Sequence, residues 1–239
     1  QPTLDGFEDI EVHAALPQQL TFESQPLLGL AGRTLSPHVV VAIRDVYGNP
    51  VSQVGSSVGL DAIPETAVQG TWTASPDSTG RVRFEDLKIL QSGVYRLRAT
   101  AHVSEAQSVS VVSDELTIQA DAASRLAFSV FDPPATGEIS ERPWQAFKVN
   151  VVDASGNLIV SDSSTELRLA VSDVLEGPED GTLAGPNATL SFFVVAGQAI
   201  VSGLNYDVAS RLRLSIRDTE NRFLPLVFEV TIHPGTTAD

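Results

Sequence analysis

The sequence predicts an all-β protein made of two consecutive antiparallel β-sandwiches. Two observations carry this prediction: apolar and polar residues alternate with a period of two, and the same landmarks recur in the same order in both halves. Fourteen prolines and 17 glycines interrupt the alternating runs at short intervals. No stretch shows the 3.6-residue apolar period of a helix. Alternation of this kind is typical of antiparallel sheets with one buried and one solvated face.

The clearest repeated pattern is Asp-x-x-Gly-Asn, which follows an apolar run at residues 45–49 and again at residues 153–157. Before it, "LTFESQP" from Leu20 matches "LAFSVFD" from Leu126; after it, "GRVRFEDLKI" from Gly80 matches "GQAIVSGLNY" from Gly197. The shared order indicates two homologous units. We place them at residues 14–119 and 120–234.

The ends of the units also repeat. "IEVHAALPQQLTF" from Ile10 resembles "LTIQADAASRLAF" from Leu116, and "VTIHPG" from Val230 repeats its first part. We therefore expect residues 1–13 to be an N-terminal strand or the tail of a preceding repeat, and residues 235–239 a linker tail. Since the chain begins at Gln1, we expect a piece of a longer tandem array. The linker near residues 119–123 predicts a semi-rigid pair.

Individual strands follow from the alternation. In the first unit, apolar residues share one face in three stretches: Val39, Val41 and Ile43; Val82 and Phe84; Tyr95, Leu97 and Ala99. In the second unit, the corresponding stretches are Leu167, Leu169 and Val171, then Leu212, Leu214 and Ile216. The predicted cores include Val41, Phe84, Leu97, Val149, Leu204 and Leu214.

The repeated Asp-x-x-Gly-Asn pattern predicts a turn. The aspartate can accept hydrogen bonds from amides a few residues later, and glycine reaches positive φ without steric cost. The expected turn-forming residues are Asp45, Gly48, Asn49, Asp153, Gly156 and Asn157. The alternative is a pair of Asp and Asn ligands for calcium.

A strand ending in Asp-x-x-Gly-Asn-x-Val, a glycine before "RVRFEDLKI", and then "SGVYRLRAT" together resemble the bacterial immunoglobulin-like repeats of invasin, intimin and surface-layer proteins. The resemblance covers nearly the whole chain, twice. It implies two tandem immunoglobulin-like antiparallel β-sandwiches at a bacterial cell surface. The second unit departs from the pattern, because 44 residues separate Asp153 from Gly197, against 35 from Asp45 to Gly80.

Composition narrows the classes of function. The chain has no cysteine, which excludes disulfides, thiolate metal sites and cysteine nucleophiles. A net charge of −15 argues against nucleic acid as a partner. No apolar run approaches 18 residues, so we expect no direct membrane insertion.

We expect no enzymatic activity from this chain. "GSSVG" at residues 55–59 matches the nucleophile elbow of hydrolases, but that elbow needs a following helix. Here "VGLDAI" continues as a strand, so Ser57 is predicted to be a loop residue.

Three features mark possible binding sites. The acidic stretch with Asp173, Glu176, Glu179 and Asp180 could hold calcium, as could the domain junction around Asp121; no other cofactor is expected. Trp72 and Trp144 would contact glycans if exposed and fill the core if buried. Asn187 begins a glycosylation sequon.

These observations favour a non-catalytic extracellular structural protein, acting as a spacer or stalk or as a subunit of a surface layer or filament. Its partners would be neighbouring repeats or other copies of itself. One alternative is an adhesin-type module that recognises a cell-surface receptor or glycan through loops or a sheet edge. Another is an accessory region of a larger secreted enzyme.

Overall fold

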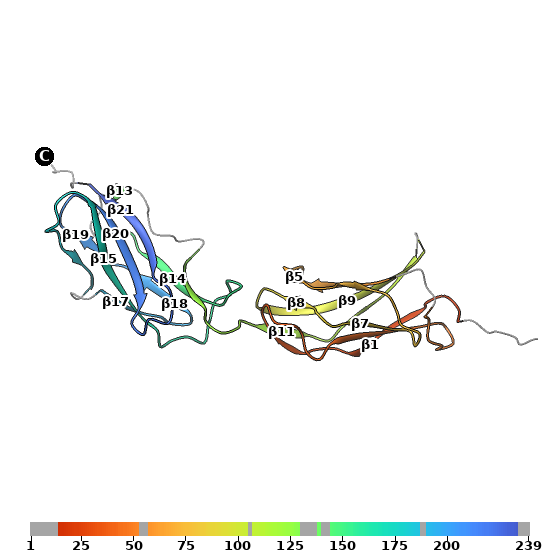
Figure 1. Ribbon diagram of the computed structural model, residues 1–239. Helices are drawn as coiled ribbons and strands as arrows, with labels where there is room; N and C mark the ends of the chain where they lie inside the picture. Colours follow the sequence, from red (N-terminus) through yellow and green to blue (C-terminus); the bar gives the residue numbers. More distant parts are fainter. Residues whose placement is uncertain are drawn as a thin grey trace, which may run out of the picture. The chain divides into compact units, whose positions relative to one another are not determined.

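The computed structural model describes residues 14–52, 57–104, 107–129, 138–139, 144–186 and 190–233. The chain divides into two compact units, residues 1–119 and 120–239, and each is an immunoglobulin-like β-sandwich (Figure 1). The predicted terminal segments, residues 1–13 and 235–239, lie outside the described residues.

The smaller sheet of the first unit has three antiparallel strands in the order β1-β3-β7. They are β1 (Gln19–Ser24), β3 (Val39–Arg44) and β7 (Arg81–Phe84). The predicted alternation holds in β7, where Val82 and Phe84 are buried, and β3 is buried along almost its whole length.

The larger sheet of the first unit has the order β2-β11-β9-β4-β6, and β10 also pairs with β9. Its strands are β2 (Leu28–Leu30), β4 (Val58–Ile63), β6 (Thr73–Ala74), β9 (Gly93–Ser104), β10 (Gln107–Val112) and β11 (Leu116–Gln119). A separate short pair joins β5 (Val68–Gln69) to β8 (Lys88–Ile89).

One pairing in this sheet differs from the predicted antiparallel pattern. Strand β2 runs parallel to β11, with Leu28 opposite Thr117. Only residues 25–27 separate β1 from β2, so the chain crosses between the two sheets without a hairpin turn. The edge strand is therefore parallel to its neighbour.

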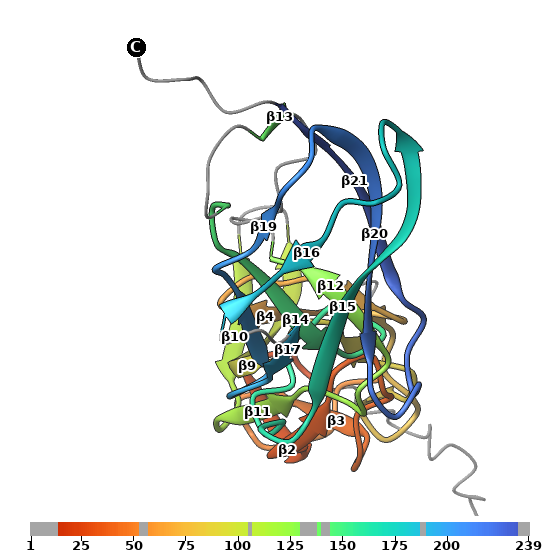
Figure 2. The ribbon, with the colours of Figure 1, turned by 90° about the vertical axis from the view of Figure 1, so that its left-hand side faces the viewer.

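The second unit repeats this plan. Its smaller sheet has the order β12-β14-β18 and its larger sheet the order β13-β21-β20-β15-β17; Figure 2 shows β15, β20 and β21 running side by side. The small-sheet strands are β12 (Arg125–Phe128), β14 (Phe147–Val152) and β18 (Gln198–Val201). The large-sheet strands are β13 (Glu138–Ile139), β15 (Glu166–Glu176), β17 (Ser191–Phe193), β20 (Ser210–Asp218) and β21 (Leu226–Ile232).

The second unit also reproduces the parallel edge, because β13 pairs with β21 in the parallel orientation. Part of its greater length goes into β15, which has 11 residues where β4 has six. Beyond β15, a short pair joins β16 (Leu183–Ala184) to β19 (Asn205–Tyr206). The extra residues therefore lengthen one strand and its connection and leave the sandwich plan unchanged.

Each unit has its own apolar core. The six predicted core residues are all at most 2% exposed: Val41, Phe84, Leu97, Val149, Leu204 and Leu214. The second core also contains Phe128, Phe147 and Phe228, whose rings meet edge to face at centroid distances of 5.5–6.1 Å. Among the described residues, no helix has the length and apolar character needed to cross a membrane.

Candidate functional site

The first Asp-x-x-Gly-Asn pattern forms a tight turn between β3 and the following segment. Asp45 is 3% exposed, and its Oδ1 accepts the backbone N–H groups of Tyr47 at 2.9 Å and Asn49 at 2.8 Å. The side-chain amide of Asn49 donates to Oδ2 at 3.0 Å. Gly48 has φ +85°, a conformation that non-glycine residues rarely adopt.

The second pattern forms the same turn after β14. Asp153 is fully buried, and its Oδ1 accepts the backbone N–H of Asn157 at 2.8 Å. The Asn157 side-chain amide donates to Oδ2 at 2.9 Å, and Gly156 has φ +91°. All six predicted turn residues therefore lie in two turns with matching geometry.

Both buried carboxylates make a further contact that the sequence patterns do not reveal. Oδ2 of Asp45 accepts the backbone N–H of Ala15 at 3.1 Å, and Oδ2 of Asp153 accepts the backbone N–H of Asp121 at 3.0 Å. Each donor lies four residues before the first strand of its unit, β1 or β12. We call this pairing of a turn carboxylate with the entering chain the entry clamp.

The charge on Asp45 is stabilised by these contacts. Burial by itself raises the pKa of the carboxyl. The hydrogen bonds from the Asn49 side chain and from the backbone N–H groups of Ala15, Asn49 and Tyr47 outweigh burial and lower the pKa of Asp45 to about 2. The carboxylate is therefore ionised, and accepts hydrogen bonds, throughout the physiological pH range.

The acidic residues considered for calcium lie at the end of β15 and beyond it. Asp173 is 3.4 Å from Arg213, and Glu176 is 3.4 Å from Arg211. Glu179 and Asp180 are exposed in the connection to β16. Across the described residues, no three His, Asp or Glu side chains are close enough to hold one metal ion. Calcium binding stays a prediction, and calorimetric titration would test it.

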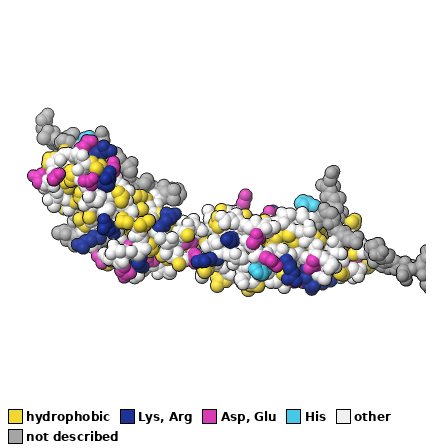
Figure 3. All heavy atoms as spheres, viewed as in Figure 1, with side chains coloured by type: hydrophobic (Ala, Val, Ile, Leu, Met, Phe, Trp, Pro, Cys, Tyr) yellow, Lys and Arg dark blue, Asp and Glu magenta, His cyan; other side chains and the backbone are white. Residues whose placement is uncertain are grey.

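Charged groups of both signs are mixed on the surface. Arg211 and Arg213 both pair with Glu229, at 3.0 and 2.9 Å. In the first unit, Arg98 pairs with Asp61 at 3.1 Å. On the face seen in Figure 3, basic and acidic side chains are likewise interspersed.

The two tryptophans have different environments. Trp144 is 5% exposed and packs in the core of the second unit, so it fills the core instead of presenting its ring for a glycan. Trp72 is half-buried, donates its Nε1–H to the carbonyl of Gln69 at 2.9 Å, and lines an open hollow of about 370 Å³ with Asp61 and Arg98. Asn187 lies outside the described residues.

The hydrolase-like pattern does not form a nucleophile elbow in the described part. Ser57 is exposed and leads directly into strand β4. An elbow requires a strand that turns into a helix, so Ser57 lacks the setting in which serine is activated.

Neither a protein-family model nor a curated protein matches the sequence. Among solved structures, the chain is similar to Bacteroides uniformis β-glucuronidase 3, with 12% identity, a TM-score of 0.31, and coverage of 90% of this chain and 25% of that one. It is also similar to the Yersinia pseudotuberculosis adhesin InvE, with 12% identity, a TM-score of 0.36, and coverage of 90% and 58%.

A third similar structure is that of the fibronectin(III)-like modules of Clostridium thermocellum CbhA, with 11% identity, a TM-score of 0.27, and coverage of 90% and 95%. The chain thus spans about a quarter of the β-glucuronidase and little more than half of the adhesin. Because all three TM-scores are below 0.5, the fold assignment rests on the strand pairing described above.

Proposed function

We propose that this chain is a non-catalytic structural module of a bacterial cell surface, acting as a spacer or stalk or as a subunit of a surface layer or filament. The observation that carries the proposal is the entry clamp, which is present in both units. A buried carboxylate, Asp45 or Asp153, holds the backbone of the entering chain at a fixed point.

A clamp at the point of entry suits a mechanical role. Tension on a tandem array passes along the backbone from one unit to the next. Strand β11 ends at Gln119, and the amide of Asp121 is already bonded to Asp153, so Ala120 alone separates these two anchored points. Hydrogen bonds to a charged acceptor are about twice as strong as neutral ones. Such a connection resists extension better than a long, unanchored linker.

Single-molecule pulling of the whole chain tests this proposal. We expect two unfolding events of similar force, one for each unit, and no prior extension from a slack connection. In the Asp153→Ala variant, a small extension should precede unfolding of the second unit. Unfolding of either unit at forces near zero would contradict a mechanical role.

Light scattering coupled to gel filtration, run over a concentration series with calcium or with chelator, separates the two forms of the proposal. A monomer under every condition supports a spacer or stalk. Polymers that form as concentration or calcium rises support a subunit of a surface layer or filament.

A second candidate function is an adhesin-type module, and the half-buried Trp72 favours it because its ring borders an open hollow. A glycan stacked on this ring would change the fluorescence of Trp72 in a Trp144→Phe variant. Fluorescence that stays constant across a glycan panel would contradict this candidate.

A further inference from the structure

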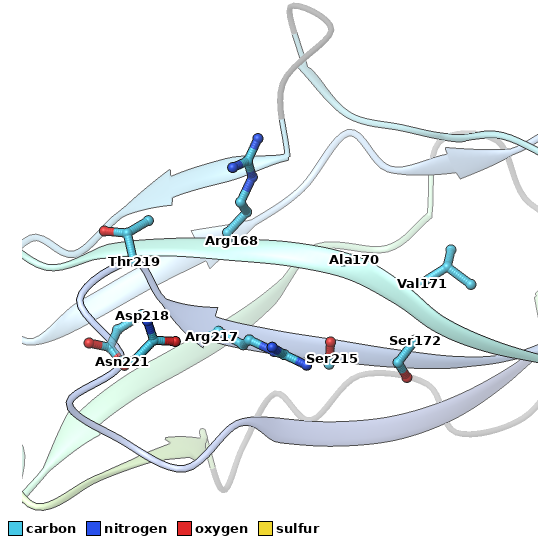
Figure 4. Close-up of a pocket in the computed structure, with 9 residues that line it drawn as sticks. All are labelled: Arg168, Ala170, Val171, Ser172, Ser215, Arg217, Asp218, Thr219 and Asn221. Carbon is cyan, nitrogen blue, oxygen red and sulfur yellow. The ribbon is translucent and has the colours of Figure 1, made fainter.

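The outer face of the larger sheet in the second unit carries an unusual pair of arginines. Arg168 of β15 lies directly opposite Arg217 of β20, and both side chains are exposed. They border an open hollow of about 490 Å³, whose remaining lining is small or polar (Figure 4). These other lining residues are Ala170, Val171, Ser172, Ser215, Asp218, Thr219 and Asn221.

The two arginines differ from the other arginines of this sheet. Arg211 and Arg213 each contact two carboxylates. Within the described part of the chain, neither Arg168 nor Arg217 forms an ion pair. Like charges directly opposite each other on a sheet destabilise it. The chain has a net charge of −15, so acidic residues are abundant, yet neither arginine is paired with one among the described residues. The stability of the sheet therefore does not explain why the two arginines lie opposite each other.

Strand register identifies the matching positions in the first unit. Leu60 of β4 lies opposite Ala99 of β9, and Leu169 lies opposite Ile216 in the second unit; all four residues are in the cores. The neighbouring pairs on the outer face can therefore be compared one by one.

On one side of this core pair, the first unit has Asp61 opposite Arg98, an ion pair that neutralises itself. The second unit has Ala170 opposite Ser215 at these positions. Two long charged side chains of the first unit thus correspond to two short ones in the second unit, and these short side chains line the hollow that the arginines border.

On the other side of the core pair, the first unit has Gly59 opposite Thr100, and the second unit has Arg168 opposite Arg217. Across these four positions, the second unit therefore lacks the acidic and the basic residue of the first unit's ion pair and has two basic residues beside the hollow. The net change makes the potential at the hollow more positive, which favours an anion. We call the hollow with its two arginines the anion-binding groove.

The lining of the hollow contains a serine hydroxyl, that of Ser215. Ser215 is 3% exposed and lines the hollow. In Figure 4 its hydroxyl oxygen points away from the ribbon of β20, and the Arg217 side chain lies beside it. A serine hydroxyl both donates and accepts hydrogen bonds, so Ser215 can bond to a polar ligand group in the hollow.

The bulge in β15 shapes one end of the hollow. The register with β20 shifts between Val171 and Asp173, and the Oγ of the intervening Ser172 donates to the carbonyl of Arg213 at 2.9 Å. The lining includes one acidic residue, Asp218, whose negative charge is balanced by its own partners and does not repel an anion in the hollow. It is 1% exposed, and its carboxylate accepts the backbone N–H groups of Arg222 and Phe223 and pairs with the Arg222 guanidinium.

The position of the groove favours one class of ligand. Strand β20 has paired neighbours on both sides, and β17 pairs with β15 over Glu166–Arg168, so the backbone beside Arg168 and Arg217 is not available to add a peptide strand. The lining has no aromatic ring for stacking a neutral sugar, but it has hydroxyl and amide groups that exchange hydrogen bonds with sugar hydroxyls. We propose that the groove binds an acidic saccharide, whose carboxylates pair with Arg168 and Arg217 and whose hydroxyls bond to Ser215 and Asn221.

Calorimetric titration of the whole chain at low salt tests this assignment. The probe is a polygalacturonate oligosaccharide, and the matched control is the same oligosaccharide with its carboxylates methyl-esterified. We expect the acid form to bind and the ester not to bind. Arg168→Gln and Arg217→Gln should each weaken binding by about tenfold or more, because each removes hydrogen bonds between charged groups.

Two further variants make the result specific. Arg83→Gln removes an exposed arginine from β7 of the first unit, away from both hollows, and should leave affinity unchanged. Ala170→Asp restores an acid where the first unit has Asp61, and should abolish binding without changing the circular dichroism spectrum. The proposal is overturned if the acid form does not bind, or if Arg168→Gln and Arg217→Gln leave its affinity intact. A poly-glutamate peptide that binds as tightly as the saccharide would also overturn it and assign the groove to an acidic protein.

Discussion

In the first unit, Asp61 and Arg98 neutralise each other across β4 and β9, whereas the matching positions of the second unit hold Ala170 and Ser215. At the entry clamps the two units are instead nearly identical. Asp45 and Asp153 accept the entering backbone N–H at 3.1 and 3.0 Å. The units thus keep the residues that fix the path of the backbone and differ on the faces that meet solvent.

This difference separates two kinds of residue. A turn aspartate is constrained by several hydrogen bonds at once, so most replacements leave buried amides unpaired. An outward-facing residue in a paired strand has few such constraints and can change without altering the fold. Residues common to both units therefore maintain the fold. A ligand that binds only one unit is expected to contact the outward-facing residues that differ between the units.

Substitution of a core leucine should produce the largest effect and test whether the units are energetically separate. Leu97→Ala and Leu214→Ala each remove a side chain at most 1% exposed. Each should cost about 2–5 kcal/mol in its own unit. Urea unfolding is followed by fluorescence of Trp72 in a Trp144→Phe background, or of Trp144 in a Trp72→Phe background. A shift in both transitions from one substitution would show that the units unfold together.

Loss of the second clamp should have the next largest effect. Asp153→Ala leaves the partly buried N–H groups of Asp121 and Asn157 without this acceptor, at a cost of about 1–3 kcal/mol. Hydrogen exchange at the Asp121 amide should accelerate in this variant. An exchange rate equal to that of the unmodified chain would mean that the clamp contributes nothing at the entry.

Loss of the first clamp should also lower stability. Asp45→Ala is expected to lower the stability of the first unit equally with calcium and with chelator, since the carboxylate serves the turn and the entering chain. A loss of stability seen only when calcium is present would favour the calcium-ligand alternative for Asp45 and Asn49.

Acid should weaken the first clamp over a defined range. The pKa of Asp45 is about 2 in the folded unit, against an ordinary value of 3.8. The stabilisation is therefore fully present above about pH 4 and is lost as the pH falls toward 2, because the unfolded chain takes up the proton first. The stability difference between the unmodified chain and Asp45→Asn should shrink over this range. A constant difference from pH 5 to pH 2 would contradict the lowered pKa.

Surface ion pairs should have the smallest effect. Arg98→Gln removes one exposed pair in the first unit, and Arg213→Gln removes two in the second, with Asp173 and Glu229. Each loss should be below about 1 kcal/mol and should disappear at high salt. Chemical denaturation at two salt concentrations measures both. A larger loss for Arg98→Gln than for Arg213→Gln would show that the ion pairs around Glu229 do not reinforce one another.

Sequence patterns predicted the sandwiches because strands with one buried and one exposed face alternate with a period of two, as in β7 and β9. They did not predict the parallel edges. Strand β2 has three residues and β13 has two, too few for alternation to be visible. Their orientation depends on where the chain crosses between sheets, which is a property of the whole unit.

The entry clamps and the arginine pair were hidden from the sequence for different reasons. The donor in each clamp is a backbone N–H, 30 or 32 residues before its acceptor, and any residue except proline supplies one. The arginine pair is visible only when the register between β15 and β20 is known. The nearest signal in the sequence was that Ala15 and Asp121 stand 106 residues apart, the same interval as "LTFESQP" and "LAFSVFD".

Each entry clamp is made entirely within its own unit, from that unit's aspartate and its own entering segment. A gene segment that encodes one unit therefore carries the complete anchorage for that unit. Duplication or deletion of such a segment changes the length of an array without requiring a matching change in the neighbouring copy. Copies of such a segment can be joined in tandem, as the two units of this chain are, while the outer face of each copy diverges independently.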